Sequence, residues 1–373
     1  MENQVPEPND DGGEIIPIRP ALEKRARQRG ALAQAIGPRL AELFEDPAIR
    51  EIDVNCNGSV FVEKLGTGGG TLDTGISLSK SESRLLVMSI AAELASQEPG
   101  VVLDEAHPNL DGKLDYTEKE FVRVALTSPP AVEQHTVEIR KHSSVVIPLE
   151  RHVETGMMTP AQLEGICSLV DRRKNVFVVG PMFSGKTTLA NGMLKRIGDV
   201  DPSRRYGYIE DVRELVCPLK NFKGVLVTKA WPIGDIMPAV VRWNLASITI
   251  SELRNGIAAN HLLTDLWLQG HDGGLTTFHA ETWRQALWRV ESLMRSVGFT
   301  PQRDLIAGSI GGIVTMRFSH ELGRKITGVY EVRKELDVHG DYQVDLLGEE
   351  VQFGHASSST PSSAFGRLRA SPA

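Results

Sequence analysis

Residues 180–187, Gly-Pro-Met-Phe-Ser-Gly-Lys-Thr, fit the pattern GxxxxGK[ST] between an apolar run and a predicted helix. In that setting backbone N–H groups curl around phosphate oxygens, the lysine reaches the β and γ phosphates, and the next hydroxyl ligates Mg²⁺. The segment therefore predicts a nucleotide site with Mg²⁺ on Thr187. The expected binding residues are Gly180, Ser184, Gly185, Lys186, Thr187 and Thr188.

Bulky residues occupy the middle of this loop, since Pro181, Met182 and Phe183 stand where such loops often carry small residues. Their side chains can point away while the backbone amides still face phosphate. The cost is backbone strain if Phe183 takes a positive φ. We expect nucleotide binding to survive and turnover to depend on the rest of the site.

Two predicted strands end in carboxylates: one closes on Glu210, with Asp211 and Glu214 behind it, and an apolar strand at residues 247–251 is followed at once by Glu252. Ligands of parallel sheets bind at the carboxyl ends of the strands. Glu252 is thus predicted to hold the Mg²⁺ shell or to orient the attacking water. The alternative for each acid is a solvated residue at a helix start, where the helix dipole favours negative charge.

Histidines and arginines complete the candidate set. His271 and His279 flank a short Thr-rich strand, and an imidazole there can interact with a γ-phosphate; a buried structural histidine is the other interpretation of each. Arg123 and Arg140, from the first half of the chain, can bring positive charge to phosphate. The alternative for both is a surface ion pair.

These side chains need a sheet to position them. Strand-like runs at 175–179, 205–210, 224–228, 247–251 and 274–279 have helical stretches between several of them, which predicts an α/β domain with a mainly parallel sheet. A helix with Thr159 as N-cap and Pro160 at its first position precedes it. Upstream, a helix from Ala31, a hairpin at Asn57-Gly58 and further strands predict a small α+β domain.

We expect four segments: a disordered tail at 1–28, the α+β domain at 29–145, the nucleotide-binding domain at 146–345 and a flexible tail at 346–373. The formal net charge is -7 and the pI about 5.9, so no overall basic field favours nucleic acid. Three scattered cysteines argue against disulfides and structural zinc. With neither a signal peptide nor a long apolar stretch, a soluble cytoplasmic protein is expected.

In this order and spacing, four segments resemble the secretion-superfamily ATPases, above all the conjugal-transfer and type IV secretion traffic ATPases. VVGPMFSGKTTLAN is similar to their Walker A loop, RYGYIEDVREL to their Asp box, ITISELRNG to their Walker B and QGHDGGLTTFHAETWRQAL to their His box. The similarity runs from about Ala31 to Val344.

The resemblance implies a homohexameric ring whose subunits hold ATP between an N-terminal domain and a RecA-like P-loop NTPase domain. It implies phosphate and Mg²⁺ roles for Lys186 and Thr187, and catalytic and Mg²⁺-shell roles for Glu210 and Glu252. His279 takes a γ-phosphate-linked role, and Arg140 matches an arginine that closes over the nucleotide. The implied work is pilus assembly or substrate transfer, at the cytoplasmic face of the inner membrane, with membrane-embedded machine components as partners.

The sequence also departs from that family. Leu245, Ala246 and Ser251 replace an acidic segment and a glycine before Glu252, which puts turnover in doubt more than binding. A type II secretion or type IV pilus motor is the alternative within the class, although the tetracysteine site common in assembly motors is missing from the sequence. A non-hydrolysing nucleotide-gated scaffold is the alternative outside it, and direct DNA translocation is disfavoured by the acidic balance.

Overall fold

The computed structural model describes residues 18–64, 71–97, 100–115, 121–141, 146–228, 230–319 and 321–351, with side chains described from residue 30 onward except at 115 and 121. The chain divides into two compact units, and the second consists of Ile147–Phe318 and the residues from Arg324 onward. Within the described ranges, no helix has both the length and the apolar character needed to cross a bilayer.

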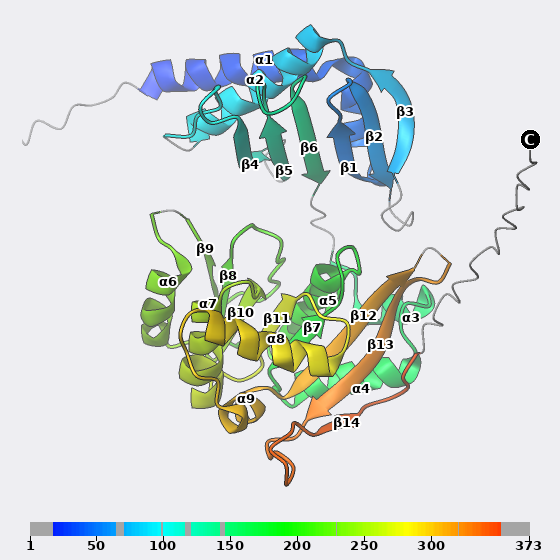
Figure 1. Ribbon diagram of the computed structural model, residues 1–373, viewed down its shortest axis with the longest axis vertical. Helices are drawn as coiled ribbons and strands as arrows, with labels where there is room; N and C mark the ends of the chain where they lie inside the picture. The colour runs from blue at the N-terminus through cyan, green and yellow to red at the C-terminus, as the bar shows by residue number, and fades with distance from the viewer. Residues whose placement is uncertain are drawn as a thin grey trace, which may run out of the picture. The chain divides into compact units, whose positions relative to one another are not determined.

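An antiparallel sheet and two helices form the first unit (Figure 1). The strand order is β3-β2-β1-β6-β5-β4, and every neighbouring pair is antiparallel. Apolar residues of both helices pack on one face of this sheet and form its core. The elements are α1 (Ile18–Glu45), β1 (Ile49–Val54), β2 (Ser59–Lys64), β3 (Thr71–Ser77), α2 (Lys80–Gln97), β4 (Asn109–Asp115), β5 (Phe121–Thr127) and β6 (Thr136–Lys141).

Local sequence signals explain several of these elements. The predicted hairpin is present, with Gly58 at φ 82 between β1 and β2. Helix α1 differs from the prediction because it begins at Ile18, inside the segment expected to be disordered, and its path breaks at Gly37 just before Pro38. Residues 1–17 of that predicted tail lie outside the described residues.

A mixed eight-stranded sheet is the centre of the second unit, in the order β14-β13-β12-β7-β11-β10-β8-β9. The six strands from β12 to β9 in this order are parallel, and β14 runs antiparallel to β13. The prediction of an α/β domain with a mainly parallel sheet is thus confirmed.

The second unit contains more elements than the first, in the chain order that follows. They are α3 (Leu149–Glu154), α4 (Pro160–Asp171), β7 (Val176–Val179), α5 (Lys186–Val200), β8 (Tyr206–Glu210), β9 (Phe222–Leu226), α6 (Ile233–Val240), β10 (Ser247–Glu252), α7 (Gly256–Asn260), β11 (Leu275–Phe278), α8 (Trp283–Ser296), α9 (Arg303–Ser309), β12 (Gly312–Ser319), β13 (Gly323–Val332) and β14 (Val344–Leu346). Val241–Trp243 and Trp267–Gln269 form 3₁₀ turns, and His261–Leu266 is π-helical.

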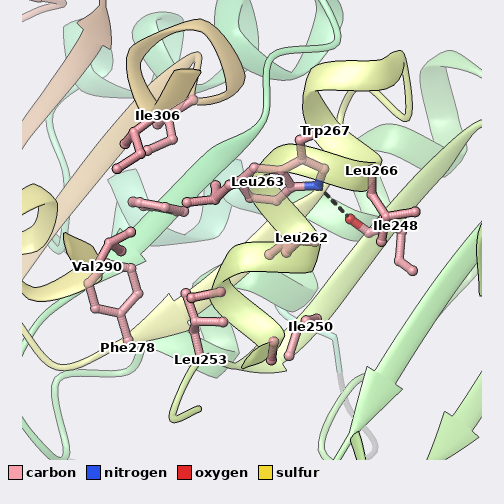
Figure 2. Close-up of a cluster of buried hydrophobic side chains, with 14 of the residues drawn as sticks. Ile248, Ile250, Leu253, Leu262, Leu263, Leu266, Trp267, Phe278, Val290 and Ile306 are labelled. Atoms are coloured by element: carbon pink, nitrogen blue, oxygen red, sulfur yellow. Dashed lines mark hydrogen bonds between the residues drawn. The ribbon is translucent and has the colours of Figure 1, made fainter. Parts of the chain in front are cut away.

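Helices cover both faces of this sheet, so its central strands are buried on both sides. One core lies under α6 to α9, where the Trp267 indole N–H donates to the Ile248 carbonyl at 3.1 Å (Figure 2). The other lies under α3, α4 and α5. This double burial agrees with the continuous apolar run Val-Phe-Val-Val of β7. In β10 and β11 the buried positions also include Ser247, Thr249, Thr276 and Thr277.

The segment after β14 differs from the predicted tail at 346–373. Leu347 N donates to Val329 O at 2.7 Å, and Val351 N donates to Thr327 O at 2.9 Å. Residues 346–351 are therefore attached to β13. The rest of the predicted tail lies outside the described residues.

Candidate nucleotide site

The loop between β7 and α5 needs glycine at both of its patterned positions. A Cβ on Gly180 would lie 2.7 Å from both Met316 O and Ser184 Oγ, which is too close for any side chain. Gly185, just before α5, has φ 90, a left-handed conformation that favours glycine. The glycines that the pattern requires are thus explained by close packing at one position and by backbone conformation at the other.

Phe183 also has a left-handed backbone, with φ 61. This conformation costs a non-glycine residue about 1–2 kcal/mol. The backbone strain expected for a positive φ at Phe183 is therefore present. The side chains of Met182 and Phe183 are 61% and 37% exposed, which agrees with their expected direction away from the loop. The Phe183 carbonyl accepts a hydrogen bond from Arg324 Nε at 2.8 Å.

The Lys186 side chain lies inside the loop rather than in solvent. Its Nζ donates to the carbonyls of Gly180 at 3.0 Å and Pro181 at 2.8 Å, and it lies 3.4 Å from His279 Nδ1. The residue is buried. A cation is therefore held where the loop N–H groups and the start of α5 add their own positive field.

His279 connects this lysine to Glu252, since its Nε2 lies 3.3 Å from Glu252 Oε1. Burial and the charge of Lys186 lower the pKa of His279, which favours a neutral ring. A neutral ring that donates from Nε2 to the carboxylate has Nδ1 available to accept from Lys186. Lys186, His279 and Glu252 therefore form a continuous chain of polar contacts.

Glu252 is kept ionised by its cationic neighbours. Burial raises its pKa, but Arg254, whose Nη2 is 2.5 Å from Glu252 Oε2, together with Lys186 holds the pKa below its usual value. An ionised carboxylate suits a metal shell or the orientation of water.

Glu210 is in a different electrostatic situation. Burial raises its pKa to about 7 even though Oε1 accepts from the backbone N–H groups of Glu214 and Leu215, both at 2.7 Å. Glu214 Oε2 in turn accepts from the Thr187 hydroxyl at 3.2 Å. Glu210 thus positions the segment whose carboxylate contacts Thr187.

The donor set fits Mg²⁺ with a phosphate ligand. Thr187 and Glu252 provide hard oxygen ligands, and Mg²⁺ is usually held by one or two protein groups together with substrate phosphates. The adjoining N-terminus of α5 and the Lys186 ammonium suit the negative charge of phosphate. Thr188 follows on α5 and is partly buried.

Parallel pairing explains why residues far apart in the sequence meet here. Phe278 pairs with Val179, and Glu252 pairs with Thr277, so β7, β10 and β11 end side by side. The predicted Lys186, Thr187, Glu210, Glu252 and His279 are brought together in this way. Their chemical roles stay predictions.

Three candidate residues belong to other segments: His271 to the loop before β11, Arg123 to β5 and Arg140 to β6. His271 precedes β11, at the opposite end of the strand from His279, and its Nδ1 lies 2.7 Å from the Leu245 carbonyl, which favours the structural interpretation. Arg140 belongs to the first unit, on β6, where its Nε is 3.4 Å from Glu51 Oε1. The role of Arg140 stays a prediction.

Sequence reasoning assigned no role to three residues that line the site: Glu214, Arg254 and Arg324. Arg254 stands two positions after Glu252, so the sequence could have suggested that the two side chains interact. Glu214 follows the predicted strand that ends in Glu210, but no local pattern connects it with Thr187. Arg324 is separated from Phe183 by 141 positions, and no local pattern connects them.

Comparison with known proteins gives one family match and several relatives. Residues 86–350 match the family described as type II/IV secretion system protein. A probable conjugal transfer protein TrbB of Sinorhizobium fredii is 28% identical over 336 residues, which cover 90% of this chain and 99% of the relative. The type IV secretion system protein VirB11 of Bartonella quintana is 27% identical over 312 residues, covering 72% and 83%.

Solved structures share the fold. The Legionella pneumophila ATPase DotB aligns with a TM-score of 0.56 at 16% identity, covering 88% of this chain and 84% of DotB. The pilus retraction motor PilT with bound ADP aligns with a TM-score of 0.54 at 15% identity, covering 84% and 82%. At these identities the likeness concerns the fold alone.

Proposed function

Because the chain belongs to the type II/IV secretion system protein family, we propose that it is a Mg²⁺-dependent ATPase of a type IV secretion system. In this proposal, ATP hydrolysis powers conjugative pilus assembly or substrate transfer. The TrbB and VirB11 relatives, named for conjugal transfer and type IV secretion, support this choice within the family.

The observation that carries the proposal is the contact chain Lys186–His279–Glu252 beside a loop that fits phosphate. A cation for the phosphates, a neutral imidazole and an ionised carboxylate stand within hydrogen-bond reach of one another. Phosphoryl transfer depends mainly on such positioning and charge stabilisation.

Each side chain then has a definite task. Lys186 exchanges its carbonyl partners for the β and γ phosphate oxygens, and the Thr187 hydroxyl turns from Glu214 toward the metal. Glu252 orients the attacking water or the metal shell, Glu210 assists as the second catalytic carboxylate, and His279 contacts the γ-phosphate. Bound Mg²⁺ supplies charge neutralisation of the phosphates.

At the level of assembly, we propose a homohexameric ring of subunits with a RecA-like P-loop domain. In this proposal Arg140, a residue of the first unit, contacts the nucleotide. The ring works at the cytoplasmic face of the inner membrane with membrane-embedded components of the machine. Binding and release of nucleotide would then move subunits in turn.

The test is phosphate release with ATP and Mg²⁺ over a range of protein concentrations, for wild type, Lys186→Ala and Glu252→Gln. Lys195→Ala is the matched control, because Lys195 lies on the same helix and pairs only at the surface with Asp199. We expect turnover that rises more than proportionally with protein concentration, a loss of at least a hundredfold in both site variants, and normal turnover in the control.

A non-hydrolysing nucleotide-gated scaffold is the second candidate, favoured by the strained Phe183 and by Ala246 in place of an acid. ATP binding without turnover above the level of the two variants would support it and contradict the proposal. A type II secretion or type IV pilus motor would hydrolyse ATP in the same assay, and complementation of a conjugation-defective strain distinguishes it.

A further inference from the structure

We propose that Arg324 is a positioning residue that holds the nucleotide loop in its phosphate-binding conformation by fixing the Phe183 peptide. This inference rests on the proposed function and adds a residue to its site. The contact that suggests it is the 2.8 Å hydrogen bond from Arg324 Nε to the Phe183 carbonyl.

The loop needs such a support because of Phe183. A phenylalanine at φ 61 gains free energy by relaxing to a negative φ, which would turn the adjoining peptide groups. The N–H groups on either side of Phe183 belong to the loop that is predicted to surround phosphate. Relaxation would therefore damage the binding site unless another group holds the peptide.

Arg324 is well placed to hold it. The residue lies near the start of β13, next to β12, which pairs with β7, so its backbone is part of the sheet. It is partly buried, and its Cδ is 3.3 Å from the position that a Cβ on Gly185 would take. The arginine stem thus packs along the loop while the guanidinium bonds the strained peptide.

The resulting mechanism is specific to the Phe183–Arg324 pair. A glycine at position 183 adopts φ near +60° at little cost and needs no support. The contribution of Arg324 to nucleotide binding should therefore depend on the residue at position 183. A direct effect of its charge on phosphate would be the same whichever residue stands there.

The experiment compares wild type, Arg324→Gln, Phe183→Gly and the double variant by the affinity for a fluorescent ATP analogue and by kcat and KM. We expect Arg324→Gln to weaken binding and raise KM about five- to tenfold, with kcat changed less than twofold. In the Phe183→Gly background the same substitution should change affinity less than twofold. Arg333→Gln, on an exposed pair with Asp345, is the matched control and should behave as wild type.

Equal weakening in both backgrounds would contradict the proposal, because Arg324 would then act on phosphate directly. No weakening in either background would also overturn it. If wild type binds no nucleotide, the proposed function fails. The Phe183–Arg324 coupling is then judged from Tm, where the effects of the two substitutions should be non-additive and simple additivity refutes it.

Discussion

At the scale of single residues, the buried Glu210 makes stability depend on pH. Its folded pKa is about 7 against a usual value of 4.5, so between these values the native state holds a proton that the unfolded state has lost. The contribution of Glu210 to the free energy of unfolding is therefore fully present below pH 4.5. It is lost as the pH rises through 7, and the loss is at most about 3 kcal/mol.

Glu210→Gln should remove that dependence. Denaturant unfolding between pH 4.5 and 8 is expected to show the variant gaining stability relative to wild type as the pH rises. Asp199→Asn, an exposed acid on α5, controls for the loss of a carboxylate. Parallel pH curves for wild type and Glu210→Gln would show that burial does not raise the pKa of this group.

Single residues also show how far sequence reasoning reaches. The places of Lys186, Thr187 and Glu252 at strand ends could be predicted because each belongs to a short local pattern, whereas their chemical roles stay predictions. The opposite pKa shifts of Glu210 and Glu252 could not be predicted from the sequence. The pKa of Glu210 is raised by burial, and that of Glu252 is lowered by Arg254 beside it. Both environments are made by segments that only the folded sheet brings together.

At the scale of elements, the N-terminus of α4 connects three segments. Thr159 Oγ1 accepts from Gln162 N at 3.2 Å, and Gln162 Oε1 accepts from Thr159 N at 3.0 Å, which completes a capping box. The fully buried Gln162 also donates from Nε2 to Ile326 O at 3.1 Å and to Glu349 O at 2.9 Å. One side chain thus joins α4, β13 and the segment after β14.

Gln162→Met keeps the volume and removes these hydrogen bonds, both to the cap and to the carbonyls of Ile326 and Glu349. We expect a loss of roughly 2–3 kcal/mol in the free energy of unfolding, together with faster amide hydrogen exchange at Leu347 and Val351. Thr159→Ser, which keeps the cap hydroxyl, is the control and should cost well under 1 kcal/mol. Unchanged exchange in the Gln162 variant would show that β13 alone holds the segment.

This element explains a partial success of the sequence prediction. The cap and the first turn of α4 were predictable because Thr159 and Pro160 act within a few residues. Attachment of residues 346–351 was not, because the donor on Gln162 is 187 positions away from Glu349. The same contrast applies to α1, whose first described turns lie in a stretch with the composition of a tail.

At the scale of the whole molecule, the proposed role of Arg140, a residue of the first unit, can be tested by substitution. Its guanidinium is 47% exposed and pairs at 3.4 Å with Glu51, so its removal should cost the first unit little stability. If Arg140 closes over the nucleotide, Arg140→Gln should lower kcat at least tenfold while the Tm stays within a few degrees of wild type. The measurement is phosphate release at saturating ATP, with Tm recorded for each variant.

Glu51→Gln separates the two possible causes of such a loss. It removes the partner of the ion pair and keeps the guanidinium, so a function of Arg140 in the pair alone predicts the same loss of kcat in Glu51→Gln. A function on the nucleotide predicts normal or slightly faster turnover, because Arg140 is then released from a half-buried carboxylate whose pKa burial raises. Equal losses in both variants would restrict Arg140 to the sheet of the first unit, and the arginine that acts on ATP would have to come from another position.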